Sequence, residues 1–264
     1  MSEQQQEQHG KWGELLSSSK LLEGYVLWDA IETDLRQGNR YAPDSSKVIE
    51  GLVRRCLNYK RERSKGEVFY RARIMPLGHD KSVGPYPPNS TEVGAPPPAK
   101  TVGGRLNPMG IPYLYLASSP ETAIDEVRGW PHALMTVASF ELQRNCELVS
   151  LRELYRFDDG LVSWLAFTLS RPADRRDQLV YVASQYIAEH IKAAGADGIE
   201  YLSSFGPRGR NVALFDPALA KCVETRLFEV EAVKVSIKEV PSQEEIEARA
   251  ATLTPPGEAG SLPP

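Results

Sequence analysis

The stretch YLYLASSPETAIDEVRGW, residues 113–130, places a strand, a turn and a helix in one short unit. Its aromatic and apolar beginning predicts a strand at Ile111–Ala117. Ser118-Ser119-Pro120-Glu121 has the pattern of a capping box with proline in the first helical turn. This pattern predicts a helix from Pro120 to about Arg128. The unit therefore sets a helix directly after a strand.

On this helix Glu126 is turned toward the protein, because it follows Ala123 by three positions and adjoins Val127. The other acidic residues of the helix, Glu121 and Asp125, fall on the opposite, solvated side. A carboxylate on an inward face requires partners, because burial of an unpaired charge is costly. We therefore take Glu126 as the unusual carboxylate of this unit.

Upstream, the chain alternates with a period of two from Glu67 onward, which predicts a strand. Arg71 and Arg73 lie on its expected cleft face and are the candidate partners of Glu126. Spacing alone leaves two interpretations open, an ion pair that braces the helix to the sheet and a functional site. The expected core face holds Val68, Tyr70, Ala72 and Ile74, and the cleft face holds Phe69, Arg71 and Arg73.

The remaining patterns predict an α+β fold with a mostly antiparallel sheet and flanking helices. Residues 20–62 have a helical pattern, while 75–101 contain seven prolines and predict a long loop, with a lid as one role. Tyr186 shares an apolar helical stripe and is assigned to the core. Further strands are expected at 134–142, 147–149, 199–202 and 211–215 and as a pair between 222 and 237, with helices near 161–168 and 179–191.

We expect three parts: a helical N-terminal segment (1–65), the main domain (66–238) and a flexible Pro/Gly-rich tail (239–264). The net charge of −4, with both signs scattered, argues against direct nucleic-acid binding. Three distant cysteines and four histidines without ligand spacing predict neither disulfide nor metal site. No stretch approaches the roughly 20 apolar residues of a membrane span, so we expect a cytoplasmic protein.

Several motifs, taken in order, resemble the RES domain family, which is similar to a divergent ADP-ribosyltransferase fold. The interval of eleven residues between Tyr115 and Glu126 agrees with the family pattern. The loop at 75–101 and the pair Asp216-Pro217 depart from it. The matching motifs are FYRAR (69–73), GGRLNP (103–108), GIPYLYLASS (110–119), ETAIDEV (121–127) and GIEYLSSFGPRGRNVALFDP (198–217).

The resemblance implies a catalytic set of Arg71, Tyr115 and Glu126, with Ser203 or Ser204 as the family's serine. Arg73 is a second candidate for the arginine role. A fixed carboxylate at Glu126 can stabilise positive charge on a ribose as nicotinamide departs. Further expected NAD-binding residues are Arg73, Arg105, Ser203, Ser204 and Asn211, the arginines through phosphate and the others through hydrogen bonds.

The same resemblance implies that NAD is the substrate and that the nicotinamide–ribose bond is cleaved, with water or phosphate as acceptor. It also implies a toxin with a helix-turn-helix antitoxin as its partner protein. A protein ADP-ribosyltransferase is the first alternative. The second is an inactive RES-like binding module, in which Arg71 and Glu126 form only a structural pair. No metal is expected.

Overall fold

In a computed structural model, the structure describes residues 19–233 except 153–158, 172–176, 178 and 206–208. The expected tail at 239–264 lies outside the described residues, as do residues 1–18. The division of the chain at 65 and 238 stays a prediction. Within the described part, no helix has the length and apolar character needed to cross a bilayer.

An eight-stranded sheet forms the centre of the described structure, in the order β1-β5-β6-β7-β3-β2-β4-β8. Only β5 and β6 pair in parallel, and the other neighbouring strands are antiparallel. The expected α+β class with a mostly antiparallel sheet is therefore confirmed. The strands are β1 (Lys60–Arg63), β2 (Val68–Ile74), β3 (Leu114–Ala117), β4 (Leu134–Leu142), β5 (Cys146–Leu151), β6 (Gly198–Leu202), β7 (Arg210–Leu214) and β8 (Ala220–Glu229).

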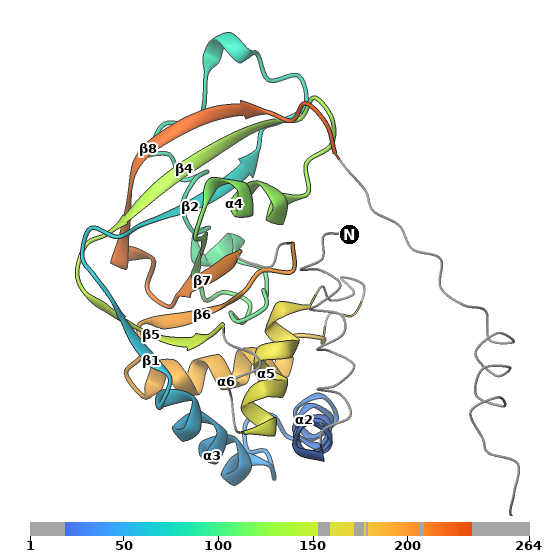
Figure 1. Cartoon of the computed structure of the whole chain (residues 1–264). Coiled ribbons are helices and arrows are strands. Elements are labelled where there is room, and N and C mark those ends of the chain that lie inside the picture. Colours follow the sequence, from blue (N-terminus) through green and yellow to red (C-terminus); the bar gives the residue numbers. More distant parts are fainter. Residues whose placement is uncertain (1–18, 153–158, 172–176, 178, 206–208, 234–264) are drawn as a thin grey trace, which may run out of the picture. The chain divides into compact units, whose positions relative to one another are not determined.

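Helices gather beside the β5–β6–β7 part of the sheet, while α4 (Pro120–Val127) lies against β2 (Figure 1). The gathered helices share one apolar core with the sheet, in which Trp28 and Leu52 join Leu151 and Ile199. Ser119 caps α4 by accepting a hydrogen bond from the backbone of Thr122, as the capping pattern predicts. The gathered helices are α2 (Ser19–Gln37), α3 (Ser46–Leu57), α5 (Gly160–Ser170) and α6 (Val182–Ala193).

Two local predictions were wrong. The helical pattern to residue 62 ends earlier, because Lys60–Arg63 form β1 and pair with β5. Val68, assigned to the core, is exposed, and Phe69, assigned to the cleft, is buried, because Phe69 packs in a second apolar cluster. β8 (Ala220–Glu229) is one strand of the pair expected between Cys222 and Ile237. Residues 234–237, which belong to the second expected strand, lie outside the described residues.

The proline-rich segment 75–101 packs against that second cluster. Val93 is buried beside Phe69 and Leu114, and Tyr86 packs on the same cluster. The segment holds only two short 3₁₀ turns, Lys81–Val83 and Pro98–Lys100, as its prolines predict. It therefore serves as a cover for one face of the sheet.

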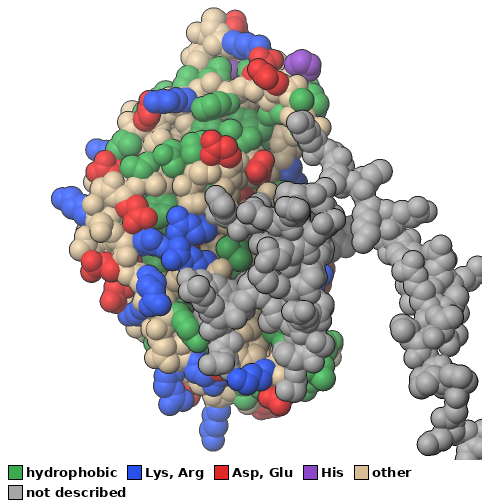
Figure 2. All heavy atoms as spheres, viewed as in Figure 1, with side chains coloured by type: hydrophobic (Ala, Val, Ile, Leu, Met, Phe, Trp, Pro, Cys, Tyr) green, Lys and Arg blue, Asp and Glu red, His purple; other side chains and the backbone are tan. Residues whose placement is uncertain are grey.

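Both edges of the sheet carry charged side chains. β1 reads Lys-Arg-Glu-Arg at one edge, and β8 at the other contains Lys221, Glu224, Arg226 and Glu229. Figure 2 shows apolar side chains at the surface over the upper part of the molecule, where β4 and β8 lie in Figure 1, and β8 contributes the exposed Val223 and Phe228. Charges along an edge strand disfavour pairing with another chain.

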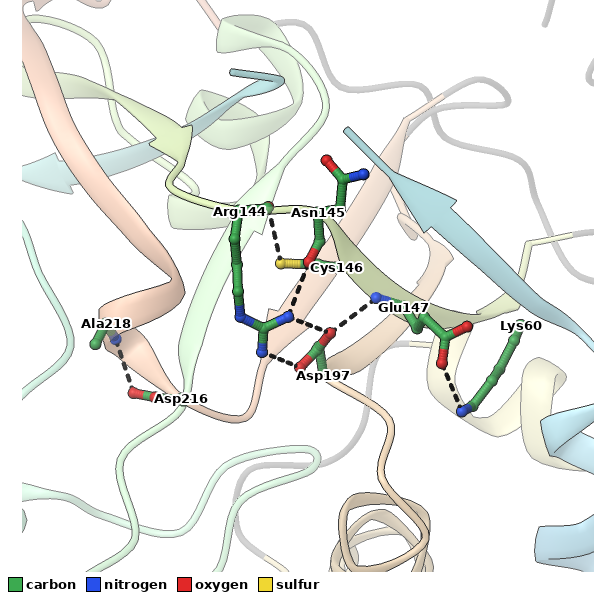
Figure 3. A network of polar contacts seen from close by, with 8 residues as sticks. All are labelled: Lys60, Arg144, Asn145, Cys146, Glu147, Asp197, Asp216 and Ala218. Atoms are coloured by element: carbon green, nitrogen blue, oxygen red, sulfur yellow. Dashed lines mark hydrogen bonds and ion pairs between the residues drawn. The ribbon is translucent and has the colours of Figure 1, made fainter. Parts of the chain in front are cut away.

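A polar network fixes the only parallel strand pair of the described sheet (Figure 3). Asp197, just before β6, accepts hydrogen bonds from both terminal nitrogens of Arg144, at 3.0 and 2.6 Å, and from the backbone of Glu147 at 2.8 Å. Burial by itself would raise the pKa of Asp197, but the bonds from Arg144 and Glu147 outweigh it and lower the pKa. The ionised Asp197 thus holds the start of β6 to β5.

Two glycines allow α2 and the start of α5 to pack at backbone contact. A Cβ atom on Gly24 would lie 2.1 Å from the carbonyl oxygen of Gly160, and one on Gly160 would lie 1.8 Å from the carbonyl oxygen of Lys20. Both distances are far inside van der Waals contact with rigid backbone. Helix α2 can therefore approach α5 this closely because these positions lack side chains.

We expect Gly160→Ala to lower the free energy of unfolding by about 1–3 kcal/mol, because overpacking forces the two helices apart. Urea denaturation followed by circular dichroism measures the change. Gly94→Ala is the matched control, since a Cβ atom there meets nothing within 4 Å. An equal loss of stability in both variants would contradict the close approach of α2 and α5.

Candidate active site

A cleft of about 1250 Å³ opens between the two halves of the sheet and the helices α4 and α6. Six of the residues predicted from the sequence line it, namely Arg71, Arg73, Arg105, Tyr115, Glu126 and Asn211. Neither predicted serine lines the cleft. Ser203 contacts Glu126 through a hydrogen bond, whereas Ser204 bonds to Ser170 instead. The described lining contains no residue of 75–101, so the lid role of that loop stays a prediction.

Glu126 is half-buried on the inward side of α4, whereas Glu121 and Asp125 are exposed, as the helical spacing predicts. Its Oε1 atom accepts hydrogen bonds from Ser203 Oγ at 2.7 Å and from Asn211 Nδ2 at 2.6 Å. Both donors are buried. The carboxylate is therefore fixed in orientation, and its Oε2 atom has no partner among the described residues.

Arg71 does not pair with Glu126 in the described structure. β2 and β3 pair only at Tyr70 and Ala117, and where the strands separate, Arg71 Nη1 donates to the carbonyl oxygen of Tyr115 at 2.7 Å. The ion pair, one of the two interpretations that spacing left open, is therefore not formed, because each side chain has neutral partners of its own. The binding-module interpretation, which depends on that pair, loses its basis.

The guanidinium of Arg71 is buried without a described counter-charge. Its Nε atom has no hydrogen-bond partner among the described residues. Burial lowers the pKa of Arg71 to about 9, and repulsion from Arg73 adds to the shift. Because a buried cation is stabilised by an anion placed against it, this corner of the cleft favours an anionic ligand group.

The glycine turn at 103–108 is built around the hydroxyl of Tyr115. This hydroxyl accepts a hydrogen bond from the backbone of Leu106 and donates to Asn107 Oδ1, both at 3.0 Å. Burial raises the pKa of Tyr115 to about 12. A Cβ atom on Gly104 would lie 2.3 Å from Asn107 Oδ1, so the turn requires glycine. Tyr115 thus presents its ring to the cleft while its hydroxyl is held.

The two other predicted arginines have structural contacts as well. Arg73 donates to the carbonyl oxygens of Glu92 and Gly94, at 3.1 and 3.4 Å, and so fixes the proline-rich segment. Arg105 Nη1 donates to carbonyl oxygens at the end of α5, those of Thr168, Leu169 and Arg171. The expected binding of phosphate by Arg73 and Arg105 stays a prediction. It would use the guanidinium nitrogens that make none of these bonds.

The structure distinguishes the two adjacent serines. Ser203 donates to Glu126, whereas Ser204 Oγ donates to the carbonyl oxygen of Ser170 at 2.6 Å, away from the cleft. Ser203 is buried beside the carboxylate and Ser204 joins the end of α5. Sequence periodicity could not separate them, since the described chain at this point has no regular secondary structure.

Sequence analysis missed part of the cleft lining. Asn107 does not line the cleft, but it is buried and donates to three backbone carbonyl oxygens of the turn that borders it. Tyr186 packs against the core, as assigned, and it also lines the cleft together with Gln185 and Glu189, of which only Glu189 had not been considered for the cleft. These residues share one face of α6, and helical spacing alone does not say that a cleft borders this face.

The sequence model of the RES domain matches residues 70–235, which is more than half of the chain. The chain belongs to the RES domain family. Proteins of this family include enzymes that act on NAD, so this RES domain is in general terms that of an NAD-acting enzyme. The matched region includes both Glu126 and the buried Arg71.

One solved structure similar to this RES domain is described as the crystal structure of the M. tuberculosis MbcT-MbcA toxin-antitoxin complex. The TM-score is 0.40 at 15% identity, covering 69% of this chain and 92% of that chain. A comparison with curated proteins gave no match. In the described part of this RES domain, no three His, Cys, Asp or Glu side chains converge in a group that could hold a metal ion.

The two serines allow a matched test of the site. We expect Ser203→Ala to slow NAD consumption by about 10- to 100-fold, because a hydrogen bond to a charged group contributes about 1.5–3 kcal/mol. Ser204→Ala removes the neighbouring hydroxyl and should leave the rate nearly unchanged. Steady-state assays of NAD loss measure both variants, and equal effects would show that Glu126 is not positioned by Ser203.

Proposed function

We propose that this RES domain cleaves the bond between nicotinamide and ribose in NAD and passes ADP-ribose to water or phosphate. The observation that carries the proposal is the carboxylate of Glu126, which lines the cleft and is fixed by two buried donors to one oxygen, while its second oxygen has no partner among the described residues. Such a group suits a reaction in which positive charge develops on a sugar ring.

In the proposed reaction the bond between ribose C1′ and the nicotinamide nitrogen breaks, and the electron pair leaves with nicotinamide. The ribose becomes oxocarbenium-like, and the negative charge of Glu126 stabilises it while accepting a hydrogen bond from a ribose hydroxyl. Water then forms the new bond to C1′ and releases its second proton to solvent. With phosphate as acceptor, the product is ADP-ribose 1″-phosphate.

Arg71 supports a dinucleotide as the ligand. Its guanidinium is buried, has a single described acceptor and leaves Nε unpaired inside the fold. A pyrophosphate provides the anion that would compensate this charge, and arginine binds phosphate oxygens through two parallel hydrogen bonds. The ring of Tyr115 lies beside it in the cleft lining and can contact the nicotinamide half.

We expect the purified protein to release nicotinamide from NAD, and Glu126→Gln to reduce the rate at least about 100-fold. Gln keeps the size of the side chain and removes its charge. Chromatography of the products, with and without phosphate, distinguishes ADP-ribose from its phosphorylated form. Absence of nicotinamide release by the wild type, or an equal rate in the variant, would contradict the proposal.

The mouth of the cleft supports a protein partner. Three large apolar side chains at its rim are strongly exposed, Tyr41 at 94%, Met109 at 79% and Val102 at 75%. Exposed apolar groups around a pocket are typical of an interaction site. We propose that the protein is a toxin and that this rim binds an antitoxin of the helix-turn-helix class, which covers the cleft and blocks entry of NAD.

We expect co-expression with the proposed helix-turn-helix antitoxin to suppress NAD consumption, and Met109→Glu to weaken that complex at least about tenfold. Leu77→Glu is the matched control, since Leu77 is also 94% exposed but lies outside the cleft. Calorimetry on the purified proteins measures the affinity of each variant for the antitoxin. Transfer of label from NAD onto a protein would instead favour the alternative of a protein ADP-ribosyltransferase.

A further inference from the structure

A second carboxylate, that of Glu189 on α6, lines the same cleft as Glu126. Its Oε1 atom accepts a hydrogen bond from the hydroxyl of the buried Tyr113, and Lys192 approaches the same oxygen at 3.7 Å without belonging to the cleft lining. The Oε2 atom has no partner among the described residues. Glu189 is therefore oriented from behind, as Glu126 is, with one oxygen left for a ligand.

Three charged groups of the cleft, Glu126, Arg71 and Glu189, follow one another along the extended chain that contains β3. Asn211, which holds Glu126, pairs with Ala117. Arg71 binds the carbonyl of Tyr115, and Glu189 binds the side chain of Tyr113. At about 3.3 Å per residue, the two carboxylate anchors lie about 13 Å apart along the chain. The order is thus carboxylate, guanidinium, carboxylate.

This order matches the chemistry of a dinucleotide, in which a pyrophosphate joins two riboses. A carboxylate that accepts hydrogen bonds from ribose hydroxyls is a common means of recognising NAD, and it disfavours NADP because the 2′-phosphate replaces a donor with negative charge. The rings of Tyr186 and His190, whose centroids are 4.6 Å apart, line the cleft beside Glu189. They provide an aromatic surface next to the carboxylate for the adenine base.

We propose that Glu189 binds the 2′-hydroxyl of the adenosine ribose and makes the cleft selective for NAD over NADP. The inference rests on the proposed function, since it takes the nicotinamide ribose to lie at Glu126. It adds a specificity-determining residue that sequence analysis did not identify. The hydrogen bond from Tyr113 fixes the carboxylate, so that repulsion of a 2′-phosphate is not relieved by rotation of the side chain.

The test compares kcat/KM for NAD and NADP in the wild type and in Glu189→Gln. We expect the wild type to prefer NAD by about 100-fold, and the variant to narrow this ratio at least about tenfold, through KM more than kcat. Glu121→Gln is the matched control, an exposed carboxylate on α4 outside the cleft, and should keep the wild-type ratio.

Binding separates this inference from the proposed reaction. Calorimetry with ADP-ribose and 2′-phospho-ADP-ribose needs no turnover, and we expect the wild type to favour ADP-ribose and Glu189→Gln to lose most of that preference. If the wild type binds ADP-ribose selectively but releases no nicotinamide, the proposed reaction fails while the role of Glu189 stands. Equal affinities in the wild type, or an unchanged preference in Glu189→Gln, would overturn the role of Glu189.

Discussion

The site depends on one constraint, that the carboxylate of Glu126 is held by neutral donors. Because Ser203 and Asn211 supply its hydrogen bonds, the negative charge is oriented without being neutralised by a cation. An ion pair with Arg71 would have satisfied burial equally well, but it would have cancelled the two charges. The observed arrangement keeps a negative and a positive group separately available in one cleft.

That separation follows from the sheet. β2 pairs with β4 over seven residues but with β3 at only one, so the strands diverge beside the cleft. The carbonyl of Tyr115 finds its partner in Arg71 instead of a backbone amide. Different segments cover the two regions. The proline-rich segment packs on the second apolar cluster, which contains Phe69, whereas the turn at 103–108 and α6 border the cleft.

Much of the fold could be predicted because its elements are locally encoded. The capping sequence before Pro120 and the alternation through β2 each predicted their element, and the buried strand β4 was predicted with its observed bounds. β1 was not, because four charged residues carry no apolar alternation and form a strand only by pairing with β5. The burial of Phe69 was not predicted, because the period of two separates the two faces of a strand but does not show which segment packs on each face.

The sequence by itself determined which carboxylate of α4 turns inward, because helical spacing and a capped start are local properties of residues 119–127. The motifs also pointed to the family. Only the tertiary structure decided what holds Glu126, because its donors lie 77 and 85 positions away in the chain. It likewise decided that Glu189 shares the cleft. Contacts at such separations depend on strand register and helix docking, which no local pattern specifies.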